Sequence, residues 1–442
     1  MKQKRIFNLT TILLAIAVSS FQPTFVHSQT SDPIKAKIVT IQKQIEEIRG
    51  LKFKKPVKVQ NQSLDDFGKY LDRVLEKQMP EKLAKNYGKI VTKLGLYRGP
   101  EITDVRELAK MVMQSQAAAY YDPGTETFYV VMPNLPEGML TSVYAHELYH
   151  GLQDQYFDLE KYVLSQFEDR LNDDELLARQ ATVEGEATYI MTLWSMKSMF
   201  GAVPDTAMLE MAINMQAQLD IRTMINMLKS GAIPEASEGD IHQAVKAIDE
   251  IPSFLLETLV GAYLKGMAFV FQIQKHGWQK VQSLYAQPPV SSEQILHPQK
   301  WLNNERPYRL KWATFSDQPI FAGWDLLEAN AIGELQWRII FAVHDLASDG
   351  IMAAAGWNGD TFAVLEHQTT KELLLLIYTC WDSKTEAEEF YTLYQKLLKS
   401  KYPEEQFQHV LLTENEVLIV EGGSEEQLEA TLSFMKSIEK KR

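Results

Sequence analysis

The sequence predicts an α+β fold, with a mainly helical first domain that contains a small sheet and a C-terminal α+β domain with an antiparallel sheet. Three observations predict it. Most of the first 300 residues carry apolar positions at helical spacing. Within them, the turn signal Asp122-Pro123-Gly124 separates two short apolar stretches. Beyond Pro319, apolar stretches of strand length alternate with helical ones, which is typical of a small α+β domain.

The chain is long enough for two domains. It has 442 residues, whereas single cores seldom grow past about 250 to 300 residues. The irregular, polar stretch Asn303 to Pro319 is the best boundary. We therefore expect domains at 29–305 and 306–442, after a signal peptide at 1–28.

The amino end predicts an export signal. A basic start (Lys2, Lys4 and Arg5) precedes an apolar run from Thr11 to Val18, and small or neutral residues lead to a cleavage site after Ser28. The run is too short to span a bilayer. A buried helix is the alternative, but Gln22 and Pro23 follow at once. We expect an exported protein, periplasmic or extracellular.

The composition argues against two classes of binding partner. Lys and Arg total 45 against 58 Asp and Glu, for a net charge of −13, which argues against a nucleic acid or an anionic membrane as partner. No second stretch suggests a membrane span, so no stable membrane insertion is expected after signal cleavage. Cys380, the single cysteine, rules out an internal disulfide and reads as a small buried residue. The oligomeric state stays open.

The elements of the first domain follow from periodicity and turn signals. Its helices are expected from apolar spacing, with breaks at proline and glycine, and its sheet from a strand and a hairpin. In order, these are a helix 34–49, a strand within 50–60, two helices within 64–95 separated near Pro80, a hairpin with its second arm at Thr127–Val131, and helices at about 138–156, 173–199 and 208–228, with more helix through Gln274.

The second domain alternates helices with strands. The expected elements are a helix 331–345, strands 362–366 and 373–380, a helix 385–399, strands 410–412 and 417–421, and a last helix from Glu425. The Gly356–Asp360 stretch is expected to be a turn. Its Trp357 is either packed, which we favour, or exposed as in a partner-binding loop.

Five methionines mark the helix at 208–228: Met208, Met211, Met215, Met224 and Met227. Methionine is flexible and polarisable, and it commonly fills gaps in cores. We therefore expect this stripe to be buried rather than to form a special binding surface.

One motif carries chemistry. In His146-Glu147-Leu148-Tyr149-His150 the two histidines lie four residues apart, so on a helix both imidazoles point the same way and can bind one Zn²⁺. The glutamate between them then stands beside the metal as a general base for peptide hydrolysis. The plainer alternative is a solvated amphipathic helix.

A catalytic zinc site needs a third protein ligand and one open position for water. The best source is Ala181 to Thr188, where Glu184 and Glu186 interrupt an apolar, small-residue helix. A carboxylate among core residues is costly unless a cation compensates it. The two glutamates project in different directions, so only one of them can be a ligand, and both could instead be exposed.

These stretches resemble the gluzincins, zinc metallopeptidases whose HExxH helix is completed by a glutamate on a later helix. Val183-Glu184-Gly185-Glu186-Ala187 is similar to the ligand stretch of their aminopeptidase-like members, which implies Glu184 as third ligand and a zincin-like catalytic domain. Thr188 stands where the thermolysin-type variant has an acid. Apart from the resemblance, Glu186 or Asp154 could instead orient a ligand histidine.

A third stretch adds to this resemblance. Tyr263-Leu264-Lys265-Gly266 is similar to the Tyr-x-Lys-Gly stretch of the same enzymes, in which the tyrosine hydroxyl donates to the oxyanion. The rival donor is His297, because thermolysin-like sites use a histidine. A buried core tyrosine remains the plainer reading of Tyr263. The aminopeptidase Gly-x-Met-Glu-Asn loop does not precede His146, so exopeptidase activity is not implied.

The expected activity is therefore that of an exported zinc metallopeptidase. His146, His150 and Glu184 would bind Zn²⁺, and Glu147 would take a proton from the attacking water. The Thr127–Val131 strand could align an extended polypeptide substrate by accepting it as a further strand. Two alternatives stay open: an exported binding or scaffold protein on a zincin-like fold, and a zinc hydrolase acting on a non-peptide substrate.

Overall fold

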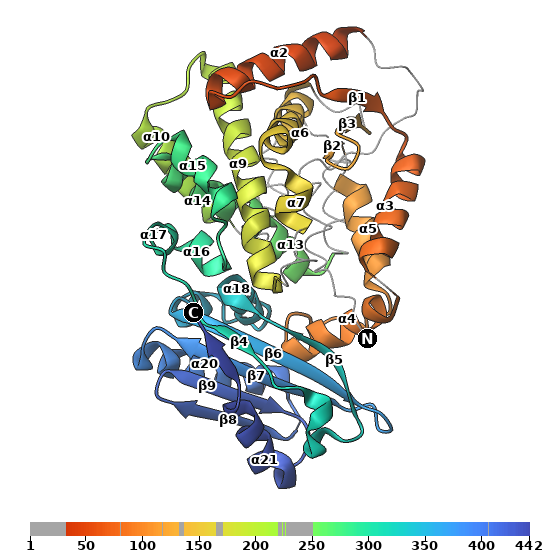
Figure 1. The fold of residues 1–442 in the computed structure, drawn as a ribbon, viewed down its shortest axis with the longest axis vertical. Coiled ribbons are helices and arrows are strands. Elements are labelled where there is room, and N and C mark those ends of the chain that lie inside the picture. Colours follow the sequence, from red (N-terminus) through yellow and green to blue (C-terminus); the bar gives the residue numbers. More distant parts are fainter. Residues whose placement is uncertain are drawn as a thin grey trace. The chain divides into compact units, whose positions relative to one another are not determined.

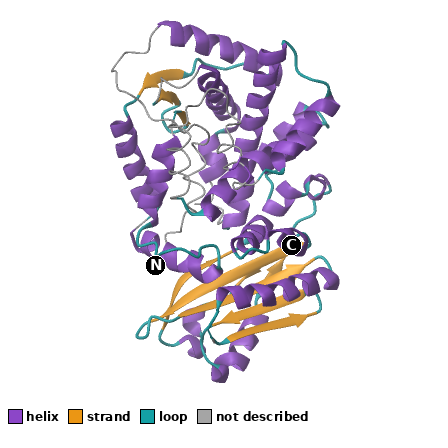
Figure 2. Ribbon diagram, turned by 180° about the vertical axis from the view of Figure 1, so that it is seen from behind, coloured by secondary structure: helices purple, strands orange, loops and turns teal. Residues whose placement is uncertain are grey.

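The structure is a computed structural model that describes most of the chain after residue 31. The described residues are 32–79, 81–116, 118–131, 137–164, 171–219, 223, 226, 251–404 and 406–442. The expected signal peptide, Met224, Met227 and the loop at 230–240 lie outside them. Within them the protein has the predicted α+β fold, with many helices, a small sheet, and an antiparallel five-stranded sheet near the carboxyl end (Figures 1 and 2).

The chain forms two compact units whose borders differ from the expected ones. The first unit contains residues up to Glu81, 105–171 and 176–289. The second contains 82–104, 172–175 and 290–442. The division thus falls at 289/290 rather than 305/306, and two short earlier segments belong to the later unit. A boundary predicted from one polar stretch divides the chain once, so it cannot show that residues 82–104 and 172–175 pack with the later part of the chain.

Helices make up most of the first unit. They are α2 (Asp32–Arg49), α3 (Leu64–Gln78), α5 (Val105–Gln116), α6 (Glu137–Phe157), α7 (Leu159–Leu164), α9 (Asp173–Phe200, from residue 176 on), α10 (Thr206–Ala217), α13 (Ser253–Val260), α14 (Gly266–Gln274) and α15 (Trp278–Ala286). The π-helical segment η1 (Gly261–Lys265) joins α13 to α14. The helices expected at 34–49, 138–156 and 173–199 are therefore present, as is the first of the two expected within 64–95, while α10 is shorter than expected.

The small sheet corrects one expectation about substrate binding. Its order is β1 (Lys58–Asn61), β3 (Thr127–Val130), β2 (Ala119–Asp122), with β1 parallel and β2 antiparallel to β3. Because β3 is paired on both sides, it has no free edge to accept a peptide, and the proposed role of Thr127–Val131 in strand addition is wrong. The Asp122-Pro123-Gly124 turn does connect a hairpin, as predicted.

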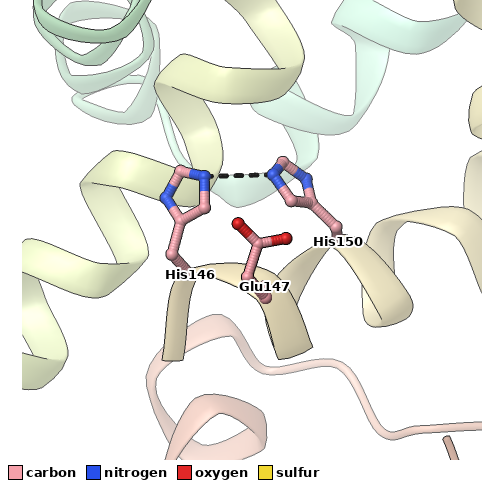
Figure 3. Close-up of side chains that lie close together, drawn as sticks. All are labelled: His146, Glu147 and His150. Atoms are coloured by element: carbon pink, nitrogen blue, oxygen red, sulfur yellow. Dashed lines mark hydrogen bonds between the residues drawn. The ribbon is translucent and has the colours of Figure 1, made fainter. Parts of the chain in front are cut away.

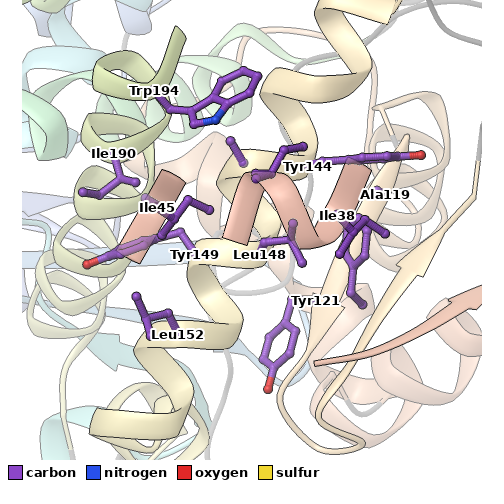
Figure 4. Close-up of a cluster of buried hydrophobic side chains, with 14 of the residues drawn as sticks. Ile38, Ile45, Ala119, Tyr121, Tyr144, Leu148, Tyr149, Leu152, Ile190 and Trp194 are labelled. Atoms are coloured by element: carbon purple, nitrogen blue, oxygen red, sulfur yellow. The ribbon is translucent and has the colours of Figure 1, made fainter. Parts of the chain in front are cut away.

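The core of the first unit surrounds α6. Ile38, Ile41 and Ile45 of α2 pack with Leu148, Tyr149 and Leu152 of α6 and with Ile190 and Trp194 of α9, as several labelled side chains in Figure 4 show. Side chains on several sides of α6 are buried, so α6 is an interior helix, and a solvated amphipathic helix is excluded. Because α6 is buried, several of its polar side chains are also shielded from water.

The segment Ser253–Gln274 (α13, η1 and α14) corrects another expectation. It is long and apolar enough to cross a membrane by length and composition, although we expected no such stretch after the signal. In the structure, 72% of its most apolar window is buried inside the protein. Such burial is typical of a core helix.

The second unit is built on the five-stranded sheet. The strand order is β5 (Trp324–Asn330), β6 (Trp357–His367), β7 (Leu373–Trp381), β9 (Glu416–Glu421), β8 (Gln408–Thr413), and every neighbouring pair is antiparallel. A two-stranded ladder joins β4 (Arg309–Lys311) to β10 (Glu439–Lys441). The helices are α4 (Glu81–Leu94, from residue 82), α16 (Ser292–Leu296), α17 (Pro298–Leu302), α18 (Gly333–Val343), α19 (Ala347–Ala354), α20 (Lys384–Lys401) and α21 (Glu425–Lys436), with 3₁₀ turns at Phe315–Asp317 and Pro319–Phe321.

Asp360 organises the start of α18. Its buried carboxylate accepts hydrogen bonds from the backbone N–H groups of Ile332 and Gly333, at 2.7 and 3.1 Å. It also accepts from the indole N–H groups of Trp337 and Trp357, both at 2.8 Å. The stretch expected to be a turn is therefore the bulged start of β6, and Trp357 is packed rather than exposed. Cys380 is buried, as expected.

The methionine stripe is not in the core. Met208, Met211 and Met215 of α10 are 56%, 70% and 68% exposed. The expectation that they fill a core is wrong for these three residues. Spacing shows that side chains share a helix face, but it does not show whether that face is covered.

Candidate metal centre

Helix α6 brings His146, Glu147 and His150 together in the interior of the first unit. Their residues are only 5%, 4% and 7% exposed. One turn separates the histidines, so their rings project from the same face, and their Nε2 atoms are 3.0 Å apart (Figure 3). The Glu147 carboxylate lies between the two imidazoles in the same view.

Glu184 reaches this pair from α9. Its Oε2 atom lies 3.1 Å from His146 Nε2 and 3.3 Å from His150 Nε2. Glu184 is 7% exposed. Three potential ligand atoms, two imidazole nitrogens and one carboxylate oxygen, therefore form a small triangle at the junction of two helices.

The dimensions of this triangle fit a zinc ion. Zinc binds histidine nitrogen and carboxylate oxygen at about 2.0–2.2 Å in a tetrahedral arrangement. With three bonds of about 2.05 Å, sides of 3.0, 3.1 and 3.3 Å correspond to angles of about 94–107° at the metal, near the tetrahedral value of about 109°. The donor set suits zinc chemically. The triangle offers three ligand atoms, one fewer than a tetrahedral zinc ion takes.

Two carboxylates compete for the place of third ligand. His146, Glu147 and His150 offer ligand atoms within 4.8 Å of one another, and Glu184 Oε2 lies within 3.3 Å of both imidazole Nε2 atoms. The Glu147 Oε2 atom accepts the backbone N–H of Tyr121 at 2.9 Å. We assign Glu184 as the better ligand and Glu147 as a carboxylate held beside the centre.

The buried charges perturb one another strongly. Burial raises the pKa of Glu147 to about 8. Burial would also raise the pKa of Glu184, but the charge of His150 and hydrogen bonds from both histidines lower it to about 2. Burial lowers the pKa of His146, whereas Glu184 and Glu147 overcome burial and raise that of His150 to about 9. A cluster of this kind in a protein interior marks a candidate functional site.

A pair of glycines lets the elements of the site meet. A Cβ atom on Gly185 of α9 would lie 2.2 Å from the carbonyl carbon of Gly266 at the start of α14. A Cβ on Gly266 would lie 2.1 Å from the carbonyl oxygen of Ala181. The two backbones therefore approach closely where neither residue has a side chain. Glu184 and Tyr263 stand next to this crossing.

Tyr263 is brought to the centre. Its ring stacks on that of His146, with ring centroids 5.6 Å apart and an interplanar angle of 23°. It lies in the π-helical segment η1, and such single turns recur at functional sites. Tyr263 is 7% exposed. Of the two expected oxyanion donors, it is the one that contacts a histidine of the motif.

His297, the rival donor, belongs to the second unit. It is the C-cap of α16, and its Nε2 atom lies 3.0 Å from Glu334 Oε1. Its ionic partner is thus a buried carboxylate of α18 in the same unit.

Glu186 and Asp154 do not orient a ligand histidine directly. Glu186 is fully buried and accepts hydrogen bonds from Arg49 Nε at 2.8 Å and Tyr149 OH at 2.6 Å. Asp154 accepts from Tyr121 OH at 2.8 Å and from the Leu159 backbone N–H at 2.9 Å. Glu186 is therefore neither exposed nor the third ligand.

Two contacts were missed from the sequence. The Tyr121 N–H that holds Glu147 comes from β2, and backbone groups leave no trace in residue identity. Gln153 contacts His150 Nδ1 through its Oε1 atom at 2.8 Å. Its position three residues after His150 on the same helix was a usable signal, since such residues are neighbours on a helix surface.

In the comparison with known protein families, only part of the second unit has a match. Residues 325–432 match a family described as a domain of unknown function (DUF8575). The matched segment begins well after α6 and α9 in the sequence. No curated protein matches the chain, and no solved structure matches it.

Proposed function

We propose that this protein is an exported zinc metallopeptidase that cleaves polypeptides with water. One observation carries the proposal: the triangle formed by His146 Nε2, His150 Nε2 and Glu184 Oε2, whose sides of 3.0 to 3.3 Å suit one tetrahedral cation. When bound there, zinc would polarise a substrate carbonyl and lower the pKa of a coordinated water toward about 7.

Glu147 is the general base of this proposal. It accepts a proton from the attacking water and later donates it to the leaving amine. The Tyr121 N–H at 2.9 Å occupies its Oε2 atom and orients the carboxylate, which leaves Oε1 for the water.

Tyr263 is the proposed oxyanion donor. Its stacking on His146 places the ring beside the metal centre, and a neutral phenol can donate to an oxygen on which negative charge develops. His297 is the less supported donor because its Nε2 atom already pairs with Glu334.

The peptide specificity rests on the resemblance to gluzincins in three short stretches around His146, Glu184 and Tyr263. The geometry supports the metal and the base, and the same centre could attack other electrophiles. A non-peptide zinc hydrolase is therefore an outcome of the test below. The third possibility, a binding or scaffold protein, has no use for a base beside a metal centre.

The test uses the protein without residues 1–28, the Glu147→Gln variant, and Glu160→Gln as a control at an exposed position of α7. Each is incubated with a mixed peptide library, cleavage is detected by mass spectrometry, and bound zinc is measured in parallel. We expect cleavage by the wild type and by Glu160→Gln, and stoichiometric zinc but almost no cleavage for Glu147→Gln. Zinc-free wild type, or equal products from Glu147→Gln, would refute the proposal. Zinc binding without any peptide product would favour the non-peptide alternative.

Export is tested separately. Expression of the full chain in a bacterium with a cell envelope should yield a mature protein that starts after Ser28, recovered outside the cytoplasm. An intact amino terminus on cytoplasmic protein would contradict this part of the proposal.

A further inference from the structure

Gln153 connects a histidine of the centre to a buried polar cluster. Its Oε1 atom lies 2.8 Å from His150 Nδ1. On its other side, Nε2 lies 3.1 Å from the carbonyl oxygen of Val183, 3.2 Å from Glu186 Oε2 and 2.7 Å from Tyr285 OH. Gln153 is 1% exposed, so water does not compete for these contacts.

The surroundings fix which way this amide points. A carbonyl oxygen and a carboxylate can only accept, so the atom facing Val183 O and Glu186 must be the NH₂ group. Tyr285 OH donates to Glu186 Oε2 and can therefore accept from the same NH₂ group. Reversing the amide would place its oxygen against two acceptors. This assignment follows from the hydrogen-bond network, as amide orientations must.

Donors from several elements compensate the charge of Glu186 in this network. Arg49 Nε donates to it at 2.8 Å, and both side chains are fully buried. Tyr149 OH donates to the same carboxylate oxygen, at 2.6 Å. The donors from Arg49, Tyr149, Gln153 and Tyr285 together occupy both oxygens of Glu186.

We propose that Gln153 is a positioning residue that fixes the tautomer of His150 for metal binding, an inference that rests on the proposed zinc centre. Because Gln153 presents an oxygen, His150 Nδ1 must carry a hydrogen and donate it. The lone pair available to a metal is then on Nε2, which faces Glu184 and His146. Glu186 and Arg49 act through Gln153. Ring orientation, and with it the nitrogen that faces the ion, is thus set before any ion arrives.

The test measures zinc affinity by competition with a coloured chelator. Gln153→Leu removes the acceptor and should weaken zinc binding about 10- to 100-fold, as loss of such partners does elsewhere. Gln155→Leu is the matched control, because Gln155 lies on the same helix but binds the backbone of Lys54 and Lys55 instead. It should bind zinc like the wild type.

A double variant tests the direction of the hydrogen bonds. In Gln153→Glu/Glu186→Gln, residue 153 still accepts from Nδ1, and the amide at 186 can donate back to it. Gln153→Glu alone places two carboxylates 3.2 Å apart or closer and should bind zinc weakly. The double variant should recover part of the lost affinity, because residue 153 still lacks a hydrogen to donate to the carbonyl oxygen of Val183. It also tests the inference if Gln153→Leu does not fold.

A second readout does not depend on affinity or turnover. In zinc-loaded protein with ¹⁵N-labelled histidine, His150 should show an exchange-protected Nδ1–H signal, assigned by its loss in His150→Gln. This signal should persist in the double variant and exchange rapidly in Gln153→Leu. Unchanged zinc affinity and an unchanged Nδ1–H signal in Gln153→Leu would overturn the inference while leaving the zinc centre intact. Absence of zinc binding by the wild type would overturn both.

Discussion

Replacing Gly185 by alanine tests whether the glycine crossing builds the metal centre. The new Cβ would lie 2.2 Å from the carbonyl carbon of Gly266 and 2.4 Å from its oxygen. Carbon atoms pack at about 3.5–4.0 Å. The obstacle is backbone rather than a flexible side chain, so α9 and α14 must separate by about 1 Å or more.

The expected stability change combines two effects of opposite sign. Overpacking of this kind costs about 1–3 kcal/mol, occasionally more. Alanine regains up to about 1 kcal/mol through its better helix propensity. The severe overlap places the overpacking cost at the upper end, so we expect a net loss of about 2 kcal/mol. That loss would lower the melting temperature by about 4–8 °C.

The effect on zinc should be larger than the effect on stability. Glu184 is adjacent to the crossing, and ligand distances must hold to about 0.2 Å. A helix shift of about 1 Å therefore removes Glu184 from the triangle with the histidines. We expect zinc affinity to fall by about 100-fold or more, on the scale of losing a ligand interaction.

The assays are thermal unfolding of the zinc-free protein and zinc titration against a chelator. Gly68→Ala on α3 is the control, because its Cβ would meet the end of the flexible Gln114 side chain, with Nε2 at 2.6 Å. It should be neutral or slightly stabilising and should bind zinc normally. Wild-type zinc affinity and melting temperature in Gly185→Ala would refute the reasoning.

Three further predictions follow from individual side chains. Glu184→Gln should lose stoichiometric zinc in metal analysis while Glu186→Gln retains it, and the reverse result would exchange their assignments. His344 is held neutral because burial lowers its pKa to about 4, so the unfolded chain takes up a proton first as the pH falls from about 6.5. The contribution of His344 to the free energy of unfolding should therefore be fully present above about pH 6.5 and should fall by about 1–2 kcal/mol toward pH 4. Denaturant titrations at several pH values should show a smaller fall in His344→Gln. Asp360→Asn should destabilise the second unit by about 3 kcal/mol in urea unfolding, whereas Asp325→Asn, an exposed partner of Gln368, should change it little. Equal midpoints for the two would contradict the assigned capping function.

The parts of the site that lie close in sequence could be predicted. His146, Glu147 and His150 share one helix, so their spacing alone fixed how they meet, and the structure brings them together with Glu184 as expected. The proposed preference for Tyr263 over His297 needed the tertiary fold, because only the structure shows the Tyr263 ring stacked on that of His146. Gln153 was accessible in principle, since it lies on the same helix as His150.

Expectations that depended on distant neighbours failed more often. The Thr127–Val130 strand was recognised, but its parallel partner β1 comes from far earlier in the chain. The exposure of Met211 and Met215 depends on what covers α10, which helical spacing does not encode. The α+β class was correct because alternating periodicities are local signals, whereas the unit borders depend on which segments pack together.

The interrupted course of the second unit has a consequence for synthesis on the ribosome. Helix α4 belongs to that unit, where Lys89 pairs with Glu366 and Gly95 accepts from His344. Translation proceeds at about 5–20 residues per second, so the nearly two hundred residues between α4 and residue 290 take roughly 10–40 seconds to make. During this interval the segments that pack against α4 have not been synthesised, so Leu83, Ile90 and Val91, which are buried in the folded protein, stay exposed. We expect this interval to be the period in which the growing chain depends most on protection from aggregation.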